Sequence, residues 1–422
     1  MLIGSLIVPP RRSLTAALAA LIAIAGCTCA PRTRPDEAKH VLGTPPRVRD
    51  IRVQLTTDQP ILQVRVAGPY RLLVAGRVVD RRDSSDFVAV QPHGNRLRIG
   101  ERTLSAASVD IVPDRSGDLY WRTRAETGWG PTRRLPGSLR LTADSGGVTA
   151  INVVDLETYL VGVVAAELYP DFHREAFRAG AVTARTYALV QMSERANDEY
   201  DVSASESSQV YIGIPDGPGG RAAAAAVRDT RGVVCTWRSP RGERIFSTYY
   251  SACCGGVTQS AAYWGQALDI APLAGGIRCD YCRIAPAQAY RWKPVRVAKA
   301  EIMSRLIDRD SEYRSLGRLR SVVPIERTPG ARLQRLRLTG TSGKVKAIRA
   351  EDFRLAVGSR VMRSTNCRIE DAGDSLVFAD GKGFGHGVGL CQWGMQGQAL
   401  AGRRAGQILE FYYPNTHLTR AY

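Results

Sequence analysis

The sequence predicts an α+β protein with a β-rich N-terminal domain, and three patterns along its 422 residues support this prediction. Short runs of alternating apolar residues recur between turn signals from Val48 to about Leu141, which is typical of strands. Two segments with apolar residues at helical spacing follow between residues 155 and 192. Past residue 230 the short strand patterns return. A few helices therefore interrupt a mainly β-structured chain.

The N-terminus has the charged, apolar and small-residue regions of an export signal. The pair Arg11-Arg12 precedes the apolar run 14–25, which is too short to span a membrane, and Ala25-Gly26-Cys27 follows it. We expect residues 1–26 to be a lipoprotein signal peptide and Cys27 to carry lipid. An ordinary secretory signal, with Cys27 incidental, is the alternative. Residues 27–46 are rich in proline, arginine and charge, which predicts a flexible tether of an exported envelope lipoprotein.

The chain is strongly basic, with a formal net charge of +18 and a pI of about 9.8. Such a charge attracts polyanions. The basic residues are nearly all arginine and are scattered, and no nucleic-acid-binding motif accompanies them. We therefore favour an anionic envelope surface over nucleic acid as the partner.

A β-rich domain over residues 47–145 follows the tether. Its turn signals include Ala67-Gly68-Pro69 and His93-Gly94-Asn95. The segments 138–141 and 148–153 read as a hairpin that leads into a second domain, over residues 146–422.

Asp155 is a suitable N-cap for a helix that runs through Tyr159 to Glu167, and Pro170 prevents its continuation. Glu167 then lies at the negative end of the helix dipole, which disfavours its charged form and raises its pKa if the carboxyl is shielded.

The next helix is predicted to start near Glu175. Its apolar stripe consists of Phe177, Ala181, Ala184, Ala188 and Met192. Arg185 falls beside this stripe, and an arginine on a packed side needs an anionic partner. Glu167 is the first candidate for that partner.

A glycine-rich segment near the C-terminus, Gly383–Gly394, holds a single histidine, His386. Glycines permit close approach of another backbone or a ligand. The histidine is either presented to a ligand or packed in a tight corner of the fold, and the spacing alone does not separate the two.

Four motifs stand in an order that resembles the SpoIID/LytB family of sporulation and amidase-enhancer proteins: Tyr159–Glu167, Ala184-Arg185-Thr186-Tyr187, Ser208-Gln209-Val210-Tyr211 and the glycine-rich segment. The resemblance implies a SpoIID-type domain that cleaves peptide-stripped peptidoglycan glycan as a lytic transglycosylase, giving a 1,6-anhydro product without a required cofactor. Glu167 matches the catalytic acid. Arg185 and His386 are implied to assist it, and Tyr187, Gln209, Tyr211 and Gln392 are implied to bind substrate. For Arg185 and Tyr187, a buried ion pair and a core tyrosine are the structural alternatives.

One block departs from the family pattern. Where many relatives have His-Ser-Thr-Ser-Gly-Gly and then Thr-Glu, this chain has Ser251-Ala252-Cys253-Cys254-Gly255-Gly256 and then Thr258-Gln259. A non-catalytic protein that binds glycan and stimulates a separate cell-wall amidase therefore remains the main alternative. A scaffold recruited through the N-terminal domain is a third.

The nine cysteines suggest a cross-link. Cys279 and Cys282 have zinc-knuckle spacing, and with Cys254 and Cys391 they offer four thiolates for a structural Zn²⁺. Export to an oxidising compartment favours disulfides instead.

Overall fold

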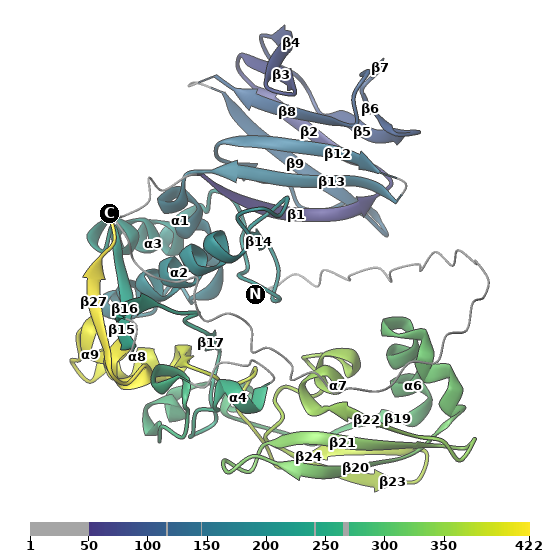
Figure 1. Cartoon of the computed structure of the whole chain (residues 1–422), viewed down its shortest axis with the longest axis vertical. Coiled ribbons are helices and arrows are strands. Elements are labelled where there is room, and N and C mark those ends of the chain that lie inside the picture. The colour runs from purple at the N-terminus through teal and green to yellow at the C-terminus, as the bar shows by residue number, and fades with distance from the viewer. Residues whose placement is uncertain (1–49, 115–116, 145, 240–241, 265–269) are drawn as a thin grey trace, which may run out of the picture. The chain divides into compact units, whose positions relative to one another are not determined.

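The computed structural model describes residues 50–114, 117–144, 146–239, 242–264 and 270–422, so the predicted signal peptide, tether and lipidated Cys27 lie outside the described residues. It contains helices and many strands, with a β-rich N-terminal region (Figure 1), and confirms the α+β prediction. Ser251–Gly394 form one compact unit, and residues 50–250 with Met395–Tyr422 form the other. We call these the inserted unit and the discontinuous unit. This division does not follow the boundary predicted between residues 145 and 146.

Two sheets build the N-terminal part of the discontinuous unit. The first has the strand order β14 (Val202–Ser203), β1 (Ile51–Gln59), β13 (Gly147–Val154), β12 (Ser138–Asp144), β8 (Ser108–Pro113), β3 (Tyr70–Val74) and β4 (Arg77–Arg82). The second has the order β10 (Gly128–Trp129), β9 (Asp118–Ala125), β2 (Leu62–Ala67), β5 (Val88–His93), β6 (Arg96–Ile99) and β7 (Arg102–Thr103), and β11 (Arg133–Leu135) also pairs with β9.

Alternation along these strands creates the core between the sheets. Leu62, Val64 and Val66 of β2 are buried, and the residues between them are partly exposed. The predicted hairpin is confirmed, because β12 and β13 pair antiparallel with Leu141 opposite Ala150. β13 also pairs with β1, so the hairpin belongs to the same sheet as the first strand.

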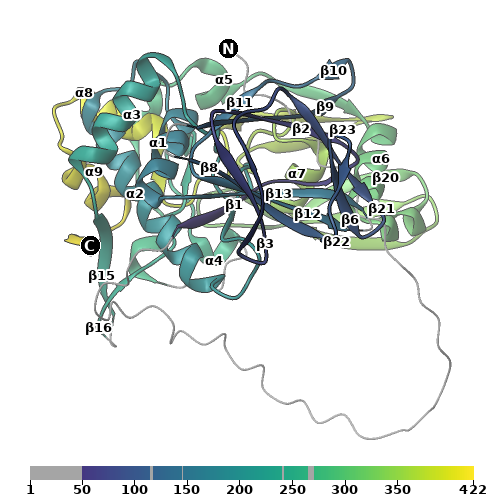
Figure 2. The same cartoon turned by 90° about the horizontal axis from the view of Figure 1, so that it is seen from above.

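Helices α1 (Leu156–Glu167), α2 (Arg174–Glu194) and α3 (Gly217–Asp229) follow β13 and pack on one another (Figure 2). The predicted cap of α1 is confirmed, since the Asp155 carboxylate accepts a hydrogen bond of 2.9 Å from the Thr158 N–H. The predicted apolar stripe of α2 is buried. The unit closes with α9 (Ala405–Tyr412) and a sheet of β16 (Gly242–Ile245), β15 (Val233–Ser239) and β27 (Thr416–Arg420).

The inserted unit has its own apolar core, which includes Leu306, Leu336, Phe353 and Phe378. Helices α6 (Lys299–Arg309) and α7 (Ala350–Val357) pack on two three-stranded sheets (Figure 1). One sheet has the order β20 (Leu319–Arg327), β21 (Leu333–Gly340), β22 (Val345–Arg349), and the other has the order β19 (Val295–Ala298), β24 (Ser375–Ala379), β23 (Arg368–Ala372).

Shorter elements complete this unit: α4 (Ala261–Trp264), η2 (Ala271–Leu273), η3 (Asp280–Ile284), α5 (Ala287–Tyr290), β18 (Arg291–Trp292), η4 (Ser311–Leu316), β25 (Gly381–Lys382) and β26 (Leu390–Cys391). The chain crosses from one unit to the other within β17 (Tyr250–Ser251) and α8 (Gln392–Leu400). Across the described parts of the chain, every helix falls short of the length and apolarity that crossing a membrane requires.

Candidate functional site

Glu167 is the last residue of α1, and its side chain is partly exposed. One carboxylate oxygen accepts a hydrogen bond of 3.0 Å from the backbone N–H of Val210, which belongs to the Ser208–Tyr211 block. The phenols of Tyr159 and Tyr250 interact electrostatically with the Glu167 carboxylate. Burial raises the pKa of both phenols, and the negative charge of Glu167 raises it further. Both tyrosines therefore stay neutral beside this carboxylate.

Arg185 is completely buried and pairs with Glu157. Its Nε and Nη2 donate to the two carboxylate oxygens of Glu157, each at 2.8 Å. The remaining hydrogen bonds go mainly to backbone carbonyls, including those of Val227 and Val233 at 3.2 Å. The expectation that Glu167 is the partner is therefore wrong, and the structural alternative holds: a side chain with no exposed surface cannot touch a bound glycan.

Glu157 is also held by Tyr422 and by the backbone N–H of Gly232. Burial raises the pKa of Glu157, but the hydrogen bonds from Arg185, its positive charge and these two further donors outweigh that effect and leave the pKa below its usual value. The pair is thus charged, and it joins α1 to α2 and to the last residue of the chain.

Gln209 and Tyr211, which were predicted to bind substrate, are completely buried. Gln209 accepts a hydrogen bond of 3.2 Å from the Tyr159 hydroxyl and lies 3.3 Å from that of Tyr250. The Tyr211 hydroxyl donates to Asn152 at 2.9 Å. Its ring also packs on Gly162 of α1, where an added methyl group would lie 2.7 Å from the ring. These side chains support α1 from within.

Tyr187 is nearly buried, with 8% of its surface exposed, and its ring meets that of Tyr249 edge-on at 6.1 Å. Burial raises the pKa of its phenol, although a hydrogen bond with Ser208 partly offsets this rise. The core-tyrosine alternative fits this position.

Two glycine-rich segments of the inserted unit lie backbone against backbone. The Cys253 N–H donates to the Phe384 carbonyl at 3.0 Å, and the Phe384 N–H donates back at 2.8 Å. An added methyl group at Gly383 would lie 2.7 Å from the Cys253 carbonyl oxygen, so only glycine fits. The close approach predicted for these glycines is therefore between two parts of the same chain.

His386 lies in this segment and lines a small pocket with Gln259, Tyr263 and Glu351. Its Nδ1 accepts a hydrogen bond of 3.0 Å from the Val388 N–H, so the neutral ring carries its proton on Nε2. Burial raises the pKa of Glu351, but Arg354, His386 and Arg332 outweigh it and leave the pKa lowered. His386 thus lies beside an ionised carboxylate, and its side chain is partly accessible. This fits the alternative in which the histidine is presented to a ligand.

Gln392 begins α8 and is almost completely buried.

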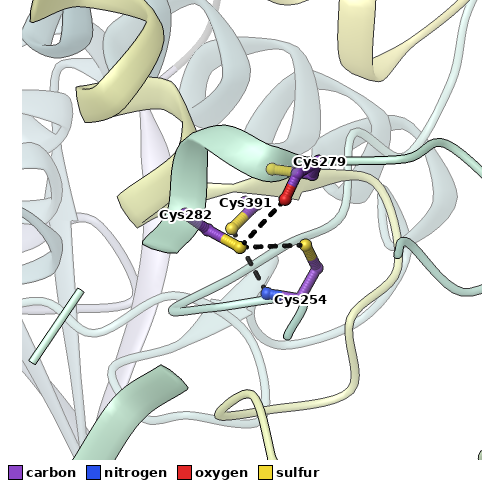
Figure 3. Close-up of side chains that lie close together, drawn as sticks. All are labelled: Cys254, Cys279, Cys282 and Cys391. Atoms are coloured by element: carbon purple, nitrogen blue, oxygen red, sulfur yellow. Dashed lines mark hydrogen bonds between the residues drawn. The ribbon is translucent and has the colours of Figure 1, made fainter. Parts of the chain in front are cut away.

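Cys391, which precedes Gln392, lies close to the three other cysteines that were predicted as zinc ligands. The sulfur atoms of Cys254, Cys279, Cys282 and Cys391 all lie within 4.8 Å of one another (Figure 3). None of the seven cysteines in the described part of the chain forms a disulfide.

Sequence reasoning missed Glu157, Asn152 and Arg332. Glu157 lies in the first turn of α1, where an acidic residue is explained by the helix dipole alone. Arg332 is buried under Gly387, where an added methyl group would lie 2.7 Å from its Cζ. No local pattern marks Glu157 or Arg332.

Comparisons with known proteins agree with these motifs. Residues 144–237 match the family model described as stage II sporulation protein, SpoIID. Stage II sporulation protein D of Bacillus subtilis is 24% identical over 286 residues, which are 64% of this chain and 76% of that protein. The amidase enhancer of Bacillus subtilis is 36% identical over 73 residues, 17% of this chain and 10% of that protein. Residues 144–237 are therefore a SpoIID-type region, and the matches support the SpoIID/LytB family.

A further relative matches this chain over most of its length. This uncharacterised protein of Brachyspira hyodysenteriae is 28% identical over 372 residues, which are 86% of this chain and 91% of that protein. The SpoIID match covers α1, α2 and α3 and so contains Glu167. Residues 283–389 match a second model, a domain of unknown function. This second region lies within the inserted unit and contains His386.

Proposed function

We propose that this protein cleaves peptidoglycan glycan strands as a lytic transglycosylase, with Glu167 as the acid. The carboxyl group protonates the glycosidic oxygen, the bond to the anomeric carbon breaks, and the C6 hydroxyl of the same sugar attacks that carbon. The carboxylate of Glu167 then takes the proton of that hydroxyl, so the group is restored and a 1,6-anhydro end forms without water. This differs from glycosidases that place two carboxylates across the bond.

The observation that carries the proposal is the position of Glu167. It combines partial exposure with a fixed carboxyl group, because the Val210 N–H holds one oxygen at 3.0 Å. The buried Arg185–Glu157 pair near the start of α1 and the hydrogen bond between Tyr159 and Gln209 hold this helix in place. A catalytic acid needs such orientation, since a misplaced proton donor loses much of its effect. The resemblance of Tyr159–Glu167 to the SpoIID/LytB motif, within the region that matches the SpoIID model, supports the same assignment.

The test uses glycan strands from which the peptides have been removed. Mass analysis should find 1,6-anhydro ends after incubation with the protein and none after incubation with Glu167→Gln, while sedimentation with insoluble glycan shows that binding survives. The matched control is Glu194→Gln, which changes the last residue of α2 in the same way and should cleave normally. Cleavage by the Glu167→Gln variant at the wild-type rate would eliminate Glu167 as the acid.

A second candidate function is binding to glycan to stimulate a separate cell-wall amidase. Similarity to the amidase enhancer supports it. So do Ser251 and Gln259, which stand where many relatives have histidine and glutamate. In this case the protein would sediment with glycan and accelerate an added amidase, but no anhydro ends would form.

We further propose that the protein works outside the cytoplasmic membrane, anchored through lipid on Cys27. The apolar run that ends at Ala25-Gly26-Cys27 supports this. The net charge of +18 would attract the chain to anionic polymers of the envelope, so a nucleic-acid partner is not needed to explain it.

A further inference from the structure

The four converging cysteines bracket the second matched region. Cys254, Cys279 and Cys282 precede residues 283–389 and Cys391 follows them, with Cys282 directly adjoining the first residue. All four belong to the inserted unit. They therefore meet where the chain enters and leaves this region.

The sulfur positions fit one tetrahedral ion better than two disulfides. In a tetrahedron with zinc–sulfur bonds of about 2.3 Å, neighbouring sulfurs are about 3.8 Å apart. The Sγ atoms of Cys254 and Cys282 are 3.7 Å apart, and all four sulfurs are mutually within 4.8 Å. A disulfide would require a sulfur pair at about 2.05 Å. Here the four sulfur atoms lie close together (Figure 3).

Backbone donors around Cys391 suit a thiolate. The N–H groups of Cys254 and Gly394 point at its sulfur at 3.2 and 3.3 Å. Hydrogen bonds of this kind to a ligand atom are typical of the surroundings of a metal site. The segment Cys279-x-x-Cys282, from the N-cap of η3 into its first turn, supplies two ligands from one short stretch of chain, as zinc knuckles do.

A buried cation lies next to these thiolates. Arg332 is 1% exposed, and its Nη2 donates to the Cys254 carbonyl at 2.7 Å. Its Nη1 is buried and has no hydrogen-bond partner among the described residues. One Zn²⁺ with four thiolates carries a net charge of −2, so a buried positive charge beside it offsets part of the unfavourable burial.

We propose that Cys254, Cys279, Cys282 and Cys391 bind one zinc ion, which clasps the two ends of the region 283–389, and that Arg332 balances its charge. Binding replaces the four thiol protons, which pass to the buffer, so no oxidant or reductant is needed.

The full chain, purified under reducing conditions without chelator, is analysed for metal. We expect about one zinc per chain. Changing Cys279→Ser and Cys282→Ser together should abolish binding, whereas the control Cys367→Ser, also a buried cysteine but outside the cluster, should retain it. Arg332→Met should weaken zinc binding about 10- to 100-fold, as expected of a group behind the ligands.

A second measurement does not depend on whether the variants fold. Replacing zinc by Co²⁺ in the wild-type chain should give the thiolate-to-metal charge-transfer absorption and the visible bands of tetrahedral cobalt. A mercurial reagent should release the zinc as four thiols react. Protein without metal overturns the proposal, whether its four cysteines are free or joined in disulfides, and iron in place of zinc overturns the choice of metal.

Discussion

The Arg185–Glu157 pair gives the sharpest separation between a structural and a catalytic arginine in the Ala-Arg-Thr-Tyr block. The perturbation is Arg185→Met, then Glu157→Gln, then both together. Arg185 is 0% exposed and the Glu157 side chain 8%, so either single change leaves a buried group without its partner. Removing one member of a buried ion pair costs about 3–5 kcal/mol in the free energy of unfolding.

The double variant should lose less than the sum of the single losses, because neither charge is then left unpaired. It should not recover wild-type stability, since the carbonyls of Val227 and Val233 also lose a donor. At about 2–4 °C per kcal/mol for a unit of this size, each single change lowers the midpoint of thermal unfolding by roughly 6–20 °C.

Thermal unfolding with hydrogen exchange of α1 and α2 measures the loss within the discontinuous unit. Glycan cleavage is measured on each variant at a temperature at which that variant is still folded. If Arg185 were catalytic, the opposite pattern would appear. Arg185→Met would lose activity but keep the wild-type unfolding midpoint, and the stability losses of the two single variants would add up in the double variant. That result would refute the structural assignment.

Three further predictions follow. The stability contributed by the low pKa of Glu157 is complete above the usual carboxyl pKa of about 4.3 and is lost as the pH falls through the lowered value. The difference in free energy of unfolding between wild type and Glu157→Gln should therefore shrink below about pH 4. A difference that stays constant with pH contradicts this. Gly387→Ala should destabilise the inserted unit by more than about 1–3 kcal/mol, because clash with Arg332 adds to backbone strain at φ +77°. The control Gly276→Ala has φ +75° with nothing within 4 Å and should show the strain alone. Cys27→Ala should release the protein from membranes or block its maturation in a fractionation experiment, whereas unmodified soluble wild type contradicts a lipid anchor.

Local signals predicted the local structure well. The N-cap at Asp155, the end of α1 at Glu167 and the hairpin of β12 with β13 each depend on neighbouring residues alone, and all three are confirmed. The glycine pattern also indicated close backbone approach, which the segment around Gly383 shows.

Partner choice between distant elements could not be predicted. Glu157 and Glu167 lie on the same helix, about 15 Å apart along its axis, and the sequence does not say which end of α1 meets Arg185. The burial of Gln209 and Tyr211 depends on tertiary contacts with Tyr159 and Asn152. Residue type cannot decide this, because the same amide and phenol groups serve equally well in a binding site or as buried hydrogen-bonding partners.

The cysteines can offset the conformational entropy that the glycine-rich segments lose on folding. Glycine allows the backbones around Cys253 and Phe384 to meet, but it also has the most conformational freedom to lose on folding. A cross-link removes much of that freedom from the unfolded chain. In the chain-entropy account, closing a loop of about 100 residues is worth roughly 4–5 kcal/mol. The region 283–389 is a loop of that order between Cys282 and Cys391. A zinc clasp at its two ends would therefore stabilise the arrangement that holds His386, and it would do so without any zinc contact to the substrate.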